Sequence, residues 1–276
     1  EGRHMTETTY TIEDLLHVMQ RLRDPVDGCP WDLQQNFKSI VSSTLEECYE
    51  LVQAIEHEDF DHVAEELGDV LFQVIFYAQL GEERNLFSFH SIVNTLVEKL
   101  IRRHPHVFAD GEIDGVTGKH STVDEVRFSW ESIKQREREA RNQSGVLADI
   151  PRALPALSRA QKVQKRVAQV NFDWPDTAAV IDKLHEELDE LDGAISAQDS
   201  NGIHEEIGDV LFTCVNLARH LGLDAEESLR SSTEKFERRF QAMESLVATA
   251  GDELSSLGEE RYEQLWRQAK ADLARK

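Results

Sequence analysis

The sequence is poor in cysteine and has no long apolar run. Its three cysteines, Cys29, Cys48 and Cys214, are scattered and include no Cys-x-x-Cys pair, which argues against a disulfide framework and a cysteine-based zinc site. We therefore expect a reducing, cytoplasmic location. No run of about 18 apolar residues is present to span a bilayer, and there is no secretory leader, so no membrane association is expected.

Positive charge is also scarce. The chain has 276 residues with 30 Lys and Arg against 53 Asp and Glu, a net charge of −23. Such a chain is repelled by phosphate backbones and anionic lipids, so we expect no binding to duplex nucleic acid. No stretch alternates apolar and polar residues for long enough to predict a strand.

Apolar residues recur instead at intervals of three and four, which predicts amphipathic helices. In the first half we predict helices at about 12–22, 44–56, 62–80, 88–103 and 123–139. In the second half we predict them at about 154–167, 177–197, 204–221, 226–247 and 259–274. Proline and glycine mark loops at 24–31 and 105–122.

One acidic stretch occurs twice, 140 residues apart. Residues 46–69 begin with Glu-Glu-Cys-Tyr-Glu and end with Glu-Glu-Leu-Gly-Asp, and residues 186–209 begin with Glu-Glu-Leu-Asp-Glu and end with Glu-Glu-Ile-Gly-Asp. A repeat of this kind indicates two related domains. We predict an expression-tag remnant at 1–4, an N-terminal domain at 5–139, a linker at 140–151 and a C-terminal domain at 152–276.

The repeated acids fall on two predicted antiparallel helices in each half. Residues three apart lie about 60° apart around a helix, so the acids of each helix share a face that borders its apolar side. The four positions are Glu187, Glu190, Glu206 and Asp209 in the second half, and Glu47, Glu50, Glu66 and Asp69 in the first. Converging carboxylates at the edge of a core require neutralising cations. Oxygen ligands alone favour Mg²⁺, with Mn²⁺ as a possible substitute.

The repeated acids have two other interpretations. Single Glu-x-x-Glu pairs commonly cover solvated helix faces, but a doubled pattern at fixed spacing argues against that explanation. A ferritin-like di-iron centre requires Glu-x-x-His on two helices. The residues three after Glu66 and Glu206 are Asp69 and Asp209, so iron is disfavoured.

Basic residues repeat after the acids, shifted by 136 positions. Lys99, Arg102, Arg103, Trp130 and Lys134 in the first half correspond to Lys235, Arg238, Arg239, Trp266 and Lys270 in the second. Cations at fixed spacing in an acidic chain suit a polyphosphate that the metal also contacts, and a tryptophan one turn before a lysine suits a nucleobase. The alternative is that the cations pair with surface acids and the tryptophans fill the core.

Together with Cys29-Pro30-Trp31-Asp32, these signatures resemble the two-domain form of the MazG family of nucleoside triphosphate pyrophosphohydrolases. The resemblance implies an all-α fold of two tandem four-helix-bundle domains, each completed by dimerisation, and hence a homodimer. It also implies Mg²⁺-dependent hydrolysis of nucleoside triphosphates, ATP included, to the monophosphate and pyrophosphate. Broad base specificity and a house-cleaning role on nucleotide pools belong to the same expectation.

The resemblance further implies roles for individual residues. Metal would be held by Glu187, Glu190, Glu206 and Asp209; phosphates would be met by Lys183, Lys235, Arg238, Arg239 and Lys270, and the base by Trp266. Glu186, Glu187 and Glu190 are the candidate catalytic carboxylates, and spacing does not decide between Glu186 and Glu187 as the base. The second domain is expected to carry the activity, because the first has Val41-Ser42-Ser43 before its acids and no lysine matching Lys183.

Two alternatives to this function stay open on sequence alone. One is a helical dimer that binds nucleotide or metal as a regulator without turnover. The other is activity in both halves, on different nucleotides. The preferred base and sugar are not predicted.

Overall fold

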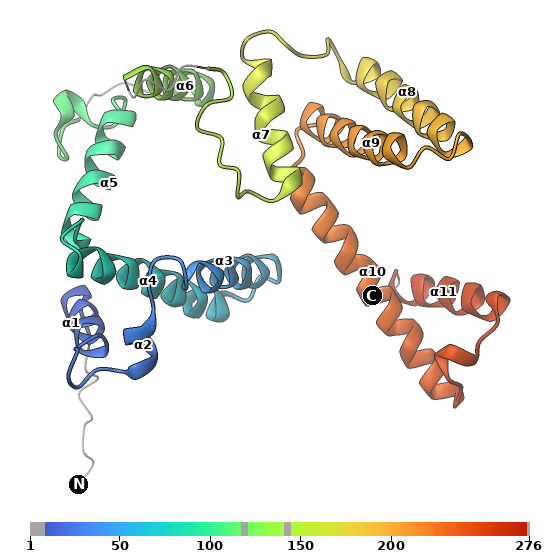
Figure 1. Ribbon diagram of the computed structural model, residues 1–276, viewed down its shortest axis with the longest axis horizontal. Helices are drawn as coiled ribbons and strands as arrows, with labels where there is room; N and C mark the ends of the chain where they lie inside the picture. Colours follow the sequence, from blue (N-terminus) through green and yellow to red (C-terminus); the bar gives the residue numbers. More distant parts are fainter. Residues whose placement is uncertain (1–8, 117–120, 141–144, 275–276) are drawn as a thin grey trace. The chain divides into compact units, whose positions relative to one another are not determined.

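The regular structure of the chain is helical (Figure 1). The computed structural model describes residues 9–116, 121–140 and 145–274, and apart from one isolated bridge between Phe108 and Val116 these contain no strand pairing. The predicted all-α fold class is thus confirmed for the described residues. None of their helices is both long and apolar enough to cross a bilayer.

By its internal contacts the chain divides into two units, residues 1–135 and 136–276. The tag remnant predicted at 1–4 lies outside the described residues, as does part of the linker predicted at 140–151. The two units are considered one at a time below.

Unit 1 is built around one long helix, α4, on which α1, α3 and α5 pack. Its core cluster consists of Met19, Ile40, Ile75, Phe76 and Leu80. The elements in order are α1 (Ile12–Leu22), α2 (Pro30–Gln34), α3 (Val41–Glu56), α4 (Phe60–Glu83), α5 (Phe89–Arg103), η1 (Ala109–Gly111) and α6 (Val123–Ala140), of which the last crosses into unit 2.

Unit 2 contains a helical hairpin, with α7 packed on its second helix. A separate cluster of Met243, Val247, Leu265 and Ala269 holds its last two long helices together. The elements in order are α7 (Ala156–Ala168), α8 (Thr177–Ser196), α9 (Ser200–His220), α10 (Ala225–Ala250), η2 (Leu254–Ser256) and α11 (Glu259–Leu273).

The α3–α4 and α8–α9 hairpins turn in the same way. Glu58 and Gln198 occupy matching positions, and both have a left-handed backbone, with φ of 55° and 56°. The next residue, Asp59 or Asp199, begins the second helix as its N-cap by accepting a hydrogen bond from a backbone N–H of the first turn. Identical turns place the acids of the two helices opposite one another in the same register.

The predicted helices are confirmed, with corrections at several of their ends. Helix α3 begins at Val41, before the predicted start at 44. α4 begins at Phe60 and α9 at Ser200, earlier than the predicted starts at 62 and 204, because the N-cap aspartates fix those starts. The predicted loop at 24–31 was wrong at its end. Pro30 begins the short helix α2, a first-turn position that suits proline because its missing N–H has no helical partner.

Candidate active site

Helices α8 and α9 bring three carboxylates together in unit 2. One carboxylate oxygen from each of Glu187, Glu190 and Glu206 lies within 4.8 Å of the other two. Glu187 is buried, Glu206 is half-buried and Glu190 is exposed, so the group opens to solvent on one side. Asp209 lies outside this triad, although its charge acts on Glu206.

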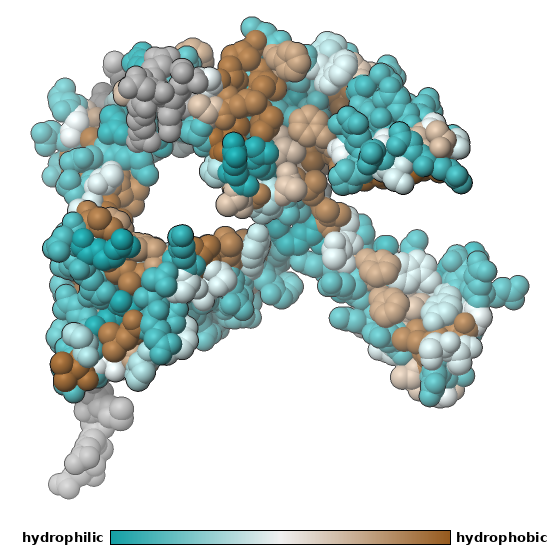
Figure 2. All heavy atoms as spheres, viewed as in Figure 1, coloured by the Kyte–Doolittle hydropathy of each residue, from teal (hydrophilic) through white to brown (hydrophobic). Residues whose placement is uncertain are grey.

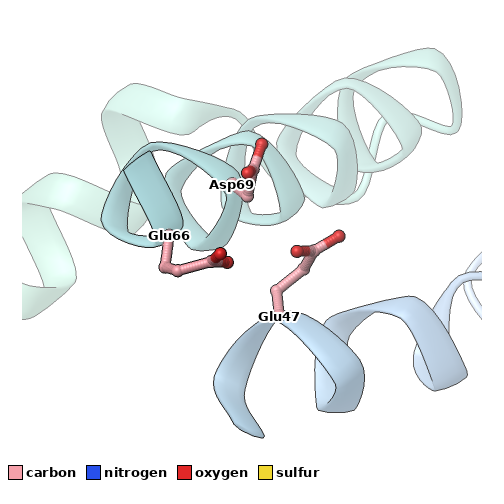
Figure 3. Close-up of side chains that lie close together, drawn as sticks. All are labelled: Glu47, Glu66 and Asp69. Carbon is pink, nitrogen blue, oxygen red and sulfur yellow. The ribbon is translucent and has the colours of Figure 1, made fainter. Parts of the chain in front are cut away.

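Helices α3 and α4 form the corresponding triad in unit 1. Oxygens of Glu47, Glu66 and Asp69 lie within 4.8 Å of one another. Figure 3 shows Glu47 extending from α3 towards the face of α4 that carries Glu66 and Asp69. Glu50, the fourth predicted acid, lies outside this triad. Each unit thus gathers three of its four predicted acids, from both helices of its hairpin.

The triads are electrostatically unfavourable without a cation. Burial, followed by the charges of Glu190, Glu187 and Asp209, raises the pKa of Glu206. In unit 1, burial and then the charge of Asp69 raise the pKa of Glu47. Such shifts arise when carboxylates lose hydration and repel one another, and a bound cation removes both penalties.

In each unit the buried acid has a basic residue one turn before it. Lys183 Nζ lies 2.8 Å from Glu186 Oε1 and 3.0 Å from Glu187 Oε1, and hydrogen bonds to these two acids raise the pKa of the lysine. His62 Nε2 lies 2.7 Å from Glu66 Oε1. His62 is not among the residues predicted from the sequence, although its i,i+4 spacing from Glu66 was the available signal.

The residues of both triads fit a hard divalent cation. Glu66 is 6% exposed, and its Oε2 is buried with no hydrogen-bond partner among the described residues. An orphaned carboxylate oxygen beside two other acids is the donor set that Mg²⁺ or Mn²⁺ uses. Gly68 and Gly208, near the acids in sequence on α4 and α9, face open space, since a Cβ added to either would meet no atom within 4 Å.

The predicted phosphate-binding cations Lys235, Arg238, Arg239 and Lys270 lie on α10 and α11, outside the α8–α9 hairpin that carries the triad of unit 2. Helix α10 packs on α7, α9 and α11, and Lys235 and Arg238 are exposed on it while Arg239 is half-buried. Lys270 is exposed on α11, where the Trp266 ring lies 5.3 Å from that of Phe236. Within the described residues, Lys183 is the predicted phosphate ligand that contacts these acids.

The matching basic residues of unit 1 lie on α5 and α6. Lys99, Arg102 and Arg103 are in the last turns of α5. Lys134 pairs with Glu131 at 3.0 Å, and the Trp130 ring packs edge-on against His104 at 5.1 Å. Trp130 Nε1 is buried without a hydrogen-bond partner among the described residues. Trp130 is therefore used in local packing.

Comparison with known proteins accounts for the doubled hairpin. The sequence profile of the MazG nucleotide pyrophosphohydrolase domain matches residues 35–108 and again residues 176–243. The chain belongs to the MazG family. Each MazG match contains one complete acid triad, and the resemblance predicted from the sequence is confirmed in its two-domain form.

Relatives of this MazG chain align over nearly its whole length. A nucleoside triphosphate pyrophosphohydrolase of Escherichia coli K12 is 49% identical over 94% of this chain and 97% of that protein. The nucleoside triphosphate pyrophosphohydrolase/pyrophosphatase MazG of Thermotoga maritima is 42% identical over 96% and 98%. Among solved structures, that of a MazG-related protein from T. maritima covers 45% of this chain and 98% of its own, with 23% identity and a TM-score of 0.37.

Proposed function

We propose that this chain hydrolyses nucleoside triphosphates to the monophosphate and pyrophosphate, with Mg²⁺, at the acid triad of unit 2. The observation that carries the proposal is the convergence of Glu187, Glu190 and Glu206 within 4.8 Å, beside a lysine. The names of the E. coli and T. maritima relatives support the same reaction.

Each group at the site has a defined task in this reaction. Glu187, Glu190 and Glu206 hold Mg²⁺, and Asp209 lies near enough to act on Glu206 by its charge. When bound, Mg²⁺ would neutralise these acids and the phosphate oxygens and make a water a better nucleophile. Lys183 presents a point charge to a phosphate oxygen, and Glu186 or Glu187 accepts the proton of the attacking water.

We further propose that a second copy of the chain completes the site. Leu188, Ile207 and Leu211, beside the acids, are 45%, 44% and 53% exposed. Figure 2 shows apolar side chains also reaching the surface of the α10–α11 pair, where Phe236 is exposed. Burying these faces in a homodimer would be favourable, and it offers a route for Lys235, Arg238, Arg239 and Lys270 to meet the phosphates.

Broad base specificity and cytoplasmic house-cleaning of nucleotide pools are part of the same proposal. The names of the relatives specify no base. The three cysteines are free, which suits a reducing compartment.

The experiment is ion-exchange analysis of ATP incubated with the protein and Mg²⁺. We expect AMP and pyrophosphate, and Glu190→Gln should lower the rate on the order of 100-fold or more, because it removes a metal ligand. Glu47→Gln, which removes a member of the unit 1 triad, is the control and should leave most of the activity. ADP plus phosphate as products would contradict the proposal. No hydrolysis by the unmutated protein would favour the alternative of a nucleotide- or metal-binding regulator.

A further inference from the structure

Unit 2 contains a pocket that the acid triad does not use. It has a volume of about 430 Å³ and lies between α7, α9 and the segment that precedes α8. Its walls include the rings of Phe172, Trp174 and Phe212. Five polar residues also line it: Gln164, Asn171, Asp173, Asn216 and Arg219. An apolar pocket of this size with a few placed polar groups is typical of a small-molecule site.

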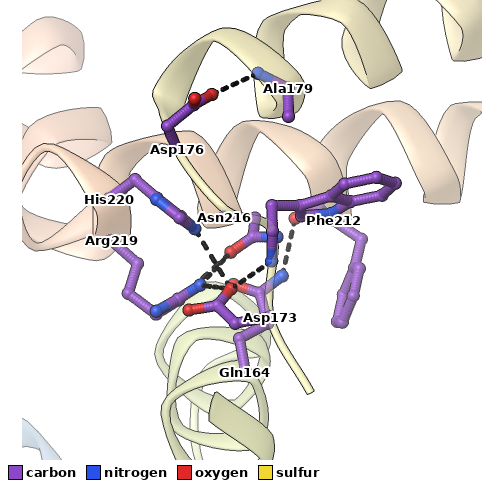
Figure 4. Close-up of polar contacts among 9 residues, drawn as sticks. Gln164, Asp173, Asp176, Ala179, Phe212, Asn216, Arg219 and His220 are labelled. Atoms are coloured by element: carbon purple, nitrogen blue, oxygen red, sulfur yellow. Dashed lines mark hydrogen bonds and ion pairs between the residues drawn. The ribbon is translucent and has the colours of Figure 1, made fainter. Parts of the chain in front are cut away.

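One polar atom of this pocket lacks a partner. Gln164 is 4% exposed, and its Nε2 donates a hydrogen bond to the Phe212 carbonyl at 2.8 Å (Figure 4). That bond fixes the amide so that Oε1 is its acceptor end. Gln164 Oε1 is buried and has no partner in the described part of the chain. Because an unpaired buried acceptor is unfavourable, the position calls for an N–H or O–H from a ligand.

A donor lies on α9, one turn after the Phe212 carbonyl that Gln164 contacts. Asn216 is buried, and its Oδ1 accepts hydrogen bonds from Arg219 Nε at 3.1 Å and Nη2 at 2.7 Å. Arg219 is itself held by Asp173, as Figure 4 shows. Since a guanidinium can only donate, it holds the Asn216 oxygen on its side and turns Nδ2 away as a donor. The pocket therefore offers one fixed acceptor and one fixed donor.

Unit 1 shows that the fold does not require the Asn216 amide. The position 140 residues before Asn216 is Phe76, on α4. Helix α1 packs on α4 as α7 packs on α9, and Met19 of α1 belongs to the same cluster as Phe76. Met19 and Phe76 are each 1% exposed. Unit 1 thus has a buried phenylalanine in its core at the position where unit 2 has Asn216.

We propose that this pocket binds the nucleobase of the substrate, an inference that rests on the proposed function. Every nucleobase carries a donor next to an acceptor on its Watson–Crick edge, and proteins read that edge with amides while aromatic rings cover the face. Gln164 Oε1 accepts from the base, Asn216 Nδ2 donates to it, and Phe172 and Trp174 stack on it. An amide pair suits several bases, in keeping with broad specificity.

The pocket also lies where a base must be. Asn216 follows Asp209 by seven residues on α9, which puts it about 20° around the helix and roughly 10 Å along it. Helix α8 packs along α9 and carries Lys183 and Glu187. A nucleotide with its base beside Asn216 can therefore extend its phosphates along the hairpin towards Lys183 and the acids.

The test is steady-state kinetics of ATP hydrolysis by the full chain with Gln164→Met or Asn216→Phe, guided by the residues of unit 1. We expect KM to rise about tenfold with kcat nearly unchanged, because binding shared by the ground and transition states is lost. Inhibition by inorganic tripolyphosphate, which has no base, should be unchanged. The control is Gln161→Met, one turn away on α7, whose amide is already paired with Leu223 O and Ala225 N.

A KM within twofold of the unmutated value in both variants overturns the proposal. So does a rise in KM confined to Trp266→Ala, which would assign the base to Trp266. If the two buried variants do not fold, Phe172→Ala gives the same readout, since this side chain is 77% exposed. If the unmutated protein does not hydrolyse ATP, the proposed function fails. Binding of adenosine, measured by calorimetry, then tests the pocket separately. Binding that is lost in Gln164→Met supports the pocket, and no binding to any form of the chain overturns it.

Discussion

At the scale of single residues, Glu206 links the acid triad to pH. Its pKa is raised above the usual 4.5, so between that value and the raised one the folded chain without metal binds more protons than the unfolded chain. The free energy of unfolding therefore falls as the pH rises through this window. A divalent cation competes with the same proton, so metal affinity rises over the same range.

We expect Glu206→Gln to raise the metal-free melting temperature near neutral pH, because it removes one of the repelling charges. The same variant should lose most of the stabilisation that Mg²⁺ gives unit 2 and most of the hydrolytic activity. The measurement is thermal unfolding from about pH 4 to about pH 8, with and without Mg²⁺. Glu205→Gln is the control, since Glu205 contributes least to the shift. An equal loss of Mg²⁺ response in Glu205→Gln would contradict the assignment.

Residue spacing alone predicted part of the site. Helical periodicity was enough to put the acids of one helix on one face, because that depends only on the backbone. Which three of the four carboxylates meet depends on side-chain conformation, and so Asp209 and Glu50 fall outside the triads. The pairing of His62 with Glu66 follows the same local rule and could have been predicted.

At the scale of elements, the helices were predictable because their apolar residues repeat over several turns. Helix α2 was not, since five residues are too few to display a period. The starts of α4 and α9 depend on the N-cap residues Asp59 and Asp199. Each is a single polar residue in a polar connection whose sequence is typical of a loop. Gly202 in the first turn of α9 weakened the helical signal there further.

The hairpin turn allows a prediction for an element. Gln198 has φ of 56°, a left-handed conformation in which glycine has no steric penalty. Gln198→Gly should therefore raise the free energy of unfolding by about 0.5–1 kcal/mol. Urea unfolding measures the change, with Gln198→Ala as the control that keeps the Cβ. Equal effects of the two substitutions would show that the left-handed backbone is not the cause.

At the scale of the whole molecule, the doubled pattern predicted both the tandem organisation and the family. The pocket of unit 2 was beyond sequence analysis. Gln164 and Asn216 lie on different helices, and only the packing of α7 on α9 brings them to one cavity. In the sequence, Gln164 and Asn216 each look like an ordinary polar residue of an amphipathic helix.

The proposed homodimer has its own test. Leu211 is 53% exposed on α9, so Leu211→Glu should cost little within one chain but would bury a charge at an interface between copies. We expect light scattering to give the mass of two chains for the unmutated protein and of one for the variant. Val26→Glu, which adds the same charge at an exposed loop position, should leave the mass unchanged. A dimer that persists in Leu211→Glu would show that the interface lies on another surface.

The empty space above Gly68 and Gly208 bears on how this protein could be made more robust. A glycine within a helix lowers its stability by about 1 kcal/mol relative to alanine, and no atom within 4 Å of the added Cβ accounts for either glycine. Gly68→Ala should therefore raise the melting temperature by about 4 °C with activity kept. Gly208→Ala should raise it equally, but Gly208 lies between Glu206 and Asp209 in the proposed active unit, so ATP hydrolysis is the measurement that compares the two variants. Thermostable variants should accordingly be sought first in unit 1, where a gain in melting temperature does not involve the proposed active site.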